Sequence, residues 1–141
     1  MWPKLFGAHC LENERAKTLR HSGVRLGEII GYRGWAVEKR WTGRSDDRLR
    51  SVFVRQYVWE PHNPATGDVQ VHGIYSFRDP GRARLAYPAL DGADVIFGSI
   101  KIWGEIVEHE LGYRAEFAKI ISLDQGNRTL LTKFRTIYGL C

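Results

Sequence analysis

The sequence predicts an α+β fold: a mostly antiparallel, barrel-like sheet with a short helix after Asp79 and a C-terminal helix. The strongest observation is the period-two alternation of apolar residues between Asp94 and Leu123, which is typical of strands with one buried face. Shorter runs rich in β-branched and aromatic residues precede it, and a helical pattern of apolar residues closes the chain. A length of 141 residues predicts a single domain over 1–141.

Residues 1–30 are expected to form an irregular, partly helical N-terminal segment. A helix over 11–19 would bury only a thin apolar face, and glycines interrupt the chain soon after it. The run 24–30 fits either a strand or a short helix, and its pattern does not separate the two.

Strand patterns dominate the next part of the chain. The runs 34–38 and 49–59 are predicted to pair as a hairpin through the polar turn 42–47. Two prolines and a glycine predict a loop over 60–68. Alternation then predicts a strand over 69–77.

Helix signals follow at two places. Asp79 and Pro80 form a typical N-cap and first helical residue, so a short helix over 81–87 is expected to end at Pro88. The last helix begins after Asp124 or Asn127, ends at Gly139 and packs on the sheet through Leu130, Leu131, Phe134, Ile137 and Tyr138.

The long alternating segment predicts an antiparallel pair of strands. The first strand starts near Asp94, a tight turn lies at 110–113, and the second strand returns over 113–121.

The positive charge is concentrated in the first part of the chain. The net charge is +5, yet residues 1–55 carry 12 basic and six acidic side chains. Such a surface attracts anionic partners, of which nucleic acid is the commonest, although a solvated basic surface is the plainer alternative. The arginines predicted to contact phosphate are Arg40, Arg44, Arg48, Arg50 and Arg55.

Aromatic residues interleave with these arginines. The chain has five Trp, six Tyr and six Phe, which fit either a stacking surface for a base or the filling of a small barrel. Trp59, at the start of the proline-rich loop, is predicted to face a ligand together with Tyr75. His72, just before a glycine, is a third candidate for the lining of a pocket, or else a hydrogen-bonded structural histidine.

An acidic cluster near the end of the long strand offers the chemistry of an enzyme. Glu105, His109 and Glu110 are the candidate catalytic residues, because carboxylates beside a histidine can transfer protons or bind a divalent metal. His72 can also meet His109 across the sheet as a metal site. The alternative is a polar strand end with cross-strand Glu–Arg pairs.

Several classes of protein are excluded. There is no Walker loop, no G-x-S-x-G and no G-x-G-x-x-G motif. The two cysteines, Cys10 and Cys141, have no metal-ligand spacing, and no stretch is long and apolar enough for a membrane span. We expect a cytoplasmic protein that has no membrane partner, and its cofactor stays undetermined.

The stretch 92–107, with its Gly-Ser-Ile-Lys-Ile strand after a small-residue turn, resembles the strand pair of PUA-like domains, including the ASCH and EVE families. The resemblance implies a compact barrel that binds RNA or modified bases. It carries no diagnostic functional residue, so it assigns no site.

A nucleic-acid- or nucleotide-binding module is therefore the leading hypothesis. One alternative is a small metal- or carboxylate-dependent enzyme that acts on a nucleotide or phosphoester. The other is a protein-binding inhibitor or adaptor of the kind phages encode.

Overall fold

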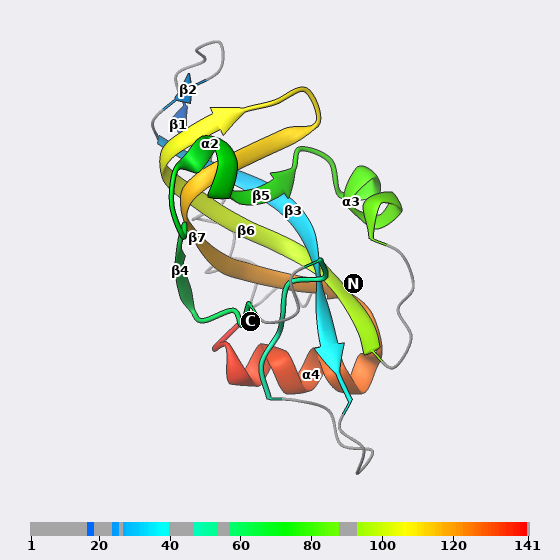
Figure 1. The fold of residues 1–141 in the computed structure, drawn as a ribbon. Coiled ribbons are helices and arrows are strands. Elements are labelled where there is room, and N and C mark those ends of the chain that lie inside the picture. The colour runs from blue at the N-terminus through cyan, green and yellow to red at the C-terminus, as the bar shows by residue number, and fades with distance from the viewer. Residues whose placement is uncertain are drawn as a thin grey trace.

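The computed structural model describes residues 17–18, 24–25, 27–39, 47–53, 57–87 and 93–140. In this part of the chain, a mostly antiparallel sheet is combined with three helices, so the predicted α+β class is confirmed (Figure 1).

Four strands of the sheet close in a ring. They are β3 (Gly27–Glu38), β5 (Ile74–Phe77), β6 (Ala93–Glu108) and β7 (Gly112–Gln125). β6 lies between β3 and β7, and β5 joins β7 back to β3, with every pairing antiparallel. The hairpin of β6 and β7 is the long antiparallel pair that the alternation predicted.

The ring is closed unevenly. β3 and β6 share ten register pairs, whereas β3 and β5, both fully described, share only the pair of Tyr32 with Phe77. Beyond Tyr32, therefore, β3 continues along β6 without β5 beside it, and the ring has an opening at this place.

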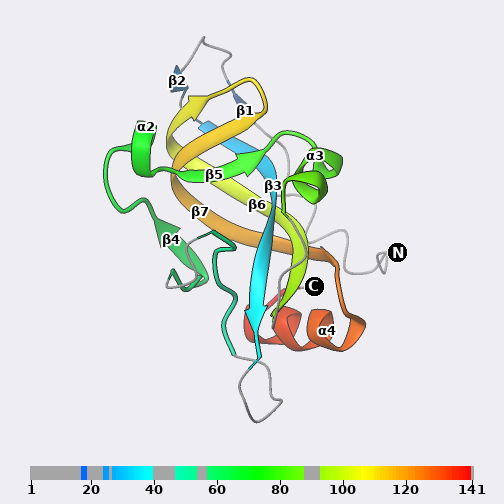
Figure 2. The same ribbon diagram turned by 45° about the vertical axis from the view of Figure 1, so that its right-hand side comes forward.

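The core fills the inside of the ring. Alternate residues of the strands form one buried apolar cluster, since successive side chains of a strand point to opposite faces. The α4 helix (Arg128–Ile137) lies across one end of the sheet, while α2 (Val69–His72) and α3 (Pro80–Ala86) lie nearer the other end (Figures 1 and 2). α4 contributes Leu131 and Phe134 to the core.

The two helix predictions based on caps are confirmed. The Asp79 side chain accepts a hydrogen bond from the Arg82 backbone, and Pro80 is the first residue of α3. The Asn127 side chain caps α4 in the same way, and Gly139 follows its end with a φ of +68°. A positive φ suits glycine, because it has no Cβ.

The predicted strand over 69–77 is wrong in its first half. Residues 69–72 form the single helical turn α2, and only 74–77 are extended. The Asp68 side chain accepts a hydrogen bond from the Gln70 backbone and starts the turn, because an Asx cap offers the backbone an alternative to the sheet ladder.

The predicted strand over 49–59 is also wrong, since its described residues form no regular strand. The segment folds back on itself: Ser51 N–H donates to Tyr57 O and Trp59 N–H donates to Leu49 O. The predicted pairing with 34–38 is reduced to one bridge, Ala36 with Arg50. The reversal lets Leu49 and Trp59 enter the main core while Val52 joins a second cluster beside Tyr87.

The irregular, partly helical segment expected over 1–30 contains strands where it is described. Lys17–Thr18 (β1) pairs with β3, and Val24–Arg25 (β2) pairs with β6. Pairing with long neighbouring strands outweighs a weak local helical pattern. For the same reason the loop expected over 60–68 contains the short strand β4 (His62–Pro64), which pairs with β7. Residues 11–16 lie outside the described residues.

None of the helices in the described part of the chain has both the length and the apolar character needed to cross a bilayer.

Candidate ligand-binding site

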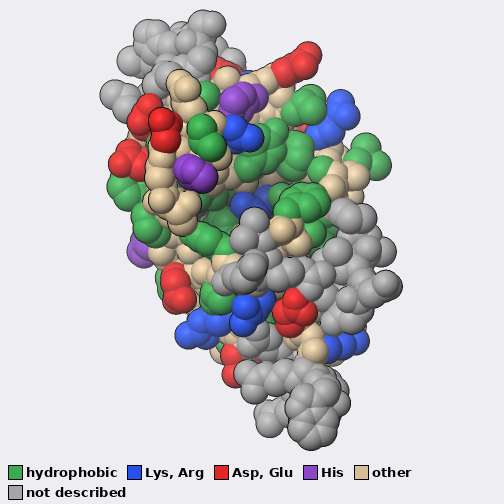
Figure 3. Space-filling view, in the orientation of Figure 1, with side chains coloured by type: hydrophobic (Ala, Val, Ile, Leu, Met, Phe, Trp, Pro, Cys, Tyr) green, Lys and Arg blue, Asp and Glu red, His purple; other side chains and the backbone are tan. Residues whose placement is uncertain are grey.

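A cavity of about 550 Å³ lies at the opening between β3 and β5. Figure 3 shows hydrophobic side chains gathered around a hollow on this face of the molecule. Cavities of 300–1,000 Å³ are typical of small-ligand sites. Six rings contribute to the lining: Phe53, Tyr57, Trp59, Tyr75, Phe77 and Tyr87.

The cavity owes its place to the uneven closure of the ring. Because β5 leaves β3 after the Tyr32–Phe77 pair, the edge of β3 that faces β5 has no paired strand there. The reversal at 49–59 and the β4 segment supply the remaining walls, and Val71 and His72 of α2 are exposed at the rim.

Arg33 is the buried cation of this cavity. Arg33 is only 7% exposed, because it occupies an inward-facing position of β3 between Gly31 and Trp35. Nη1 donates to Tyr75 O over 3.0 Å, and Nε makes a longer contact of 3.4 Å to Gly34 O. No carboxylate in the described part of the chain forms an ion pair with Arg33.

An aromatic floor holds the Arg33 guanidinium. Its carbon lies 4.6 Å from the Trp59 ring centroid and 5.7 Å from that of Trp35, within the range of cation–π attraction. The two indoles meet edge to face with their centroids 5.5 Å apart. Such a contact supplies only about 1–2 kcal/mol, less than the several kcal/mol that it costs to take one ion out of water.

Hydrogen bonds fix Trp59 in this floor. Its indole Nε1 donates to Ser51 Oγ over 3.1 Å. The Tyr138 hydroxyl, just after α4, donates to Trp59 O over 2.6 Å and accepts from Leu49 N–H. The floor is therefore tied both to the reversal at 49–59 and to the end of the C-terminal helix.

Two tyrosines in the walls remain neutral at neutral pH. Burial raises the pKa of Tyr57, and the nearby positive charge of Arg33 opposes that effect without cancelling it. Burial also raises the pKa of Tyr75, against the opposing charge of Arg114. Neutral phenols can donate hydrogen bonds, and Tyr57 donates to Pro64 O over 3.3 Å.

The three non-arginine residues predicted to bind a ligand line this one cavity. Tyr75 lies in its wall, His72 is exposed at its rim, and Trp59 is 1% exposed in its floor rather than a projecting ring. Arg48 is exposed, and Arg50 is half-buried beside the lining residue Ser51. The other predicted phosphate contacts, Arg40, Arg44 and Arg55, lie outside the described residues.

The candidate catalytic residues have different surroundings. Glu105 borders a separate polar hollow with Glu116, whose carboxylate accepts from Glu105 N–H. Glu110 is exposed beside the turn of the β6–β7 hairpin. The His109 ring lies 6.4 Å from the Tyr75 ring, and its buried Nε2 has no hydrogen-bond partner. Among the described residues, no three metal-ligating side chains cluster together.

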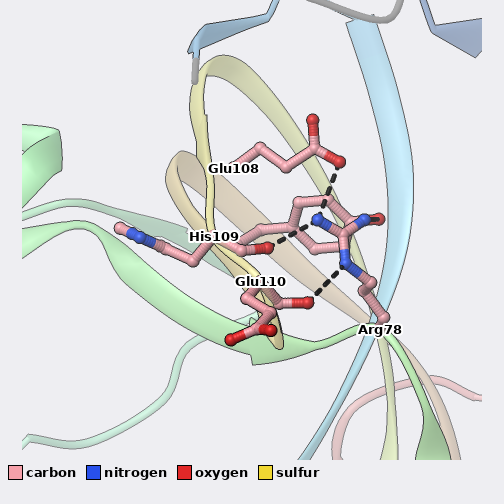
Figure 4. Close-up of polar contacts among 5 residues, drawn as sticks. Arg78, Glu108, His109 and Glu110 are labelled. Carbon is pink, nitrogen blue, oxygen red and sulfur yellow. Dashed lines mark hydrogen bonds and ion pairs between the residues drawn. The ribbon is translucent and has the colours of Figure 1, made fainter. Parts of the chain in front are cut away.

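The acidic strand end is organised by Arg78 (Figure 4). The Arg78 guanidinium pairs with Glu108 over 2.7 Å, and it donates to His109 O and Glu110 O over 2.6 and 3.1 Å. It also donates to the Tyr113 hydroxyl over 2.8 Å. Four of its five N–H donors bind within the fold, so this arginine serves as a clamp on the hairpin.

Comparison with known proteins found no matching family model, curated protein or solved structure. The resemblance to PUA-like domains accordingly stays a prediction.

Sequence reasoning missed Arg33 as a site residue. It is absent from the arginines that the sequence predicts to contact phosphate. A charged residue that precedes Gly34 and Trp35 within an apolar run occupies a buried strand position, and buried arginines are rare unless they have a partner. That conflict between charge and surroundings was the available signal.

Proposed function

We propose that the protein is a nucleic-acid- or nucleotide-binding module that holds a base in the cavity at the opening of the ring. The observation that carries the proposal is the buried Arg33 guanidinium, which has no ion-pair partner in the described structure and lies against an aromatic-lined cavity.

The lining favours a flat ligand. Tyr75 and Phe77 meet edge to face at 5.0 Å, and Phe53 stacks with Tyr87 at 5.6 Å. Rings of this kind hold extruded or unpaired bases by stacking, which is worth about 1–3 kcal/mol per base. A cavity of about 550 Å³ has room for a nucleoside.

The cation favours a ligand with electronegative edge atoms. A buried guanidinium with few partners lowers stability, and an acceptor-bearing ligand offsets that cost. A purely apolar ligand would give the guanidinium no hydrogen-bond acceptor, so we expect the cavity to bind hydrocarbons less well.

The remaining support comes from the surface and the fold. Arg48 and Arg50 lie on the segment that also carries the lining residues Ser51 and Phe53. From there they can contact the phosphates of a nucleic acid whose base lies in the cavity. The strands close in a ring, and the resemblance to PUA-like domains that the sequence predicts implies the same class of ligand.

Titration of the tryptophan fluorescence tests the proposal. Nucleoside monophosphates and a short single-stranded oligonucleotide should each bind saturably, since Trp59 lies in the cavity floor. Tyr75→Leu should weaken binding by about tenfold through lost stacking, whereas the distant surface variant Arg128→Gln should not. Absence of saturable binding by either probe up to millimolar concentration would refute the proposal.

Salt dependence separates a nucleic acid from a free nucleotide. If a single-stranded nucleic acid is the ligand, its binding affinity should fall steeply as the salt concentration rises. Replacing Arg48 and Arg50 together by Gln should then make the affinity less dependent on salt. An oligonucleotide that binds no better than its nucleotide, with a flat salt dependence, would identify a free nucleotide as the ligand.

A further inference from the structure

We infer that Arg33 reads the O6 and N7 edge of guanine, so that the cavity accepts guanine in preference to adenine. The inference rests on the proposed function, because it names the base that the same cavity takes. It follows from the hydrogen bonds that Arg33 makes and from those it leaves open.

Arg33 has donors to spare on one side. A guanidinium carries five N–H donors in a rigid planar fork. One Nη1 hydrogen is used by Tyr75 O, and the Nε hydrogen makes the long contact to Gly34 O. In the described structure, both hydrogens of Nη2 and the second of Nη1 have no protein partner. Donors on adjacent nitrogens match two adjacent acceptors in one plane.

Guanine presents such a pair of acceptors. Its O6 and N7 accept two parallel hydrogen bonds from an arginine, whereas adenine has an amino donor beside its N7. Adenine would place that donor against the guanidinium and bury unpaired N–H groups, which is unfavourable in a water-poor cavity. A bidentate contact of this type discriminates by about tenfold or more.

A phosphate group fits the inner cavity less well. Among the described residues that line the cavity, Arg33 is the one lysine or arginine side chain, and most of the others are apolar or aromatic. A doubly charged phosphate needs several donors or cations to leave water. The base therefore lies deepest in the cavity, and the sugar and phosphate stay toward the rim near Thr66 and His72.

Binding of four nucleotides to the wild-type protein tests the inference: GMP, its 7-deaza analogue, AMP and CMP. The analogue differs from GMP in the N7 acceptor alone, so the comparison does not depend on the folding of any variant. We expect GMP to bind about tenfold or more tightly than 7-deaza-GMP and AMP. Guanosine should retain most of the affinity of GMP, and inorganic phosphate should not compete.

Arg33→Gln supplies the protein side of the test. In this variant, GMP should lose its advantage over 7-deaza-GMP, while Arg128→Gln retains it. Equal binding of GMP, 7-deaza-GMP and AMP by the wild type overturns the inference and leaves the proposed function standing. Tighter binding of CMP, or competition by phosphate, also overturns it. Failure of all four nucleotides and of an oligonucleotide to bind would overturn the proposed function itself.

Discussion

The guanidinium carbon of Arg33 lies 4.6 Å from the centre of the Trp59 ring, and this contact joins the ring of strands to the segment that folds back beside it. Arg33 comes from β3 and Trp59 from the reversal at 49–59. The pair thus places a positive charge in the wall of an otherwise largely aromatic cavity, and the stability of the protein depends on that charge.

Arg33→Met should raise the free energy of unfolding by about 1–2 kcal/mol. The variant removes a buried charge whose desolvation costs several kcal/mol, more than its contacts with Tyr75 O and Trp59 return. Urea unfolding at neutral pH measures the change, and nucleotide titration of the same variant should show loss of binding. A loss of stability above about 2 kcal/mol would contradict this account of Arg33.

Tyr57 should make the protein less stable at high pH. Burial raises the pKa of its phenol above the ordinary value of 10.0, so the folded state holds this proton more tightly than the unfolded chain. The resulting stabilisation is complete below the unfolded pKa and is lost as pH rises through the folded pKa. Urea unfolding across alkaline pH should show a shallower loss for Tyr57→Phe than for the wild type. Parallel curves would argue against the raised pKa.

Gly31→Ala should destabilise the fold by about 1–3 kcal/mol through overpacking. A Cβ at residue 31 would overlap Ser76 Oγ and lie 2.5 Å from Ser76 Cβ. The close approach of β3 and β5 beside the cavity depends on this glycine. In a double-mutant cycle followed by thermal unfolding, Ser76→Gly should recover part of the loss. Strictly additive effects of the two substitutions would show that the clash is relieved in another way.

Arg78→Ala should lower the free energy of unfolding by about 2–4 kcal/mol, since it removes the ion pair with Glu108 and the hydrogen bonds to two backbone carbonyls. Hydrogen exchange at the His109 amide, which bonds to Gly112 O, should speed up more than exchange in α4. The exposed Arg82→Ala on α3 is the matched control and should stay within about 0.5 kcal/mol of the wild type. Equal losses in both variants would show that Arg78 is no clamp.

The features that local sequence specifies could be predicted. Period-two alternation gave the β6–β7 hairpin, and the caps Asp79 and Asn127 marked the starts of α3 and α4. These signals lie within a few residues of the structure they specify, so no partner segment is needed to interpret them.

The features that depend on distant segments of the chain could not be predicted from the sequence. The reversal at 49–59 follows from burying Leu49 and Trp59 in one cluster and Val52 in another. No local pattern reveals two separate clusters. The candidate site shows the same limit. Residue type was enough to predict Trp59, His72 and Tyr75, but the burial of Arg33 beside the cavity depends on the closure of β3 into the ring.

The single Tyr32–Phe77 pair has a consequence for how a ligand would enter and leave the cavity. Separating β3 from β6 means breaking a long ladder, whereas separating β3 from β5 means breaking one register pair and the hydrogen bond from Arg33 to Tyr75 O, so we expect local opening to concentrate there. A molecule seated between Arg33 and Tyr75 touches both sides of that gap. If the proposed ligand binds there, we expect its residence time to depend on how often β3 and β5 separate, and we expect bound ligand to slow that separation.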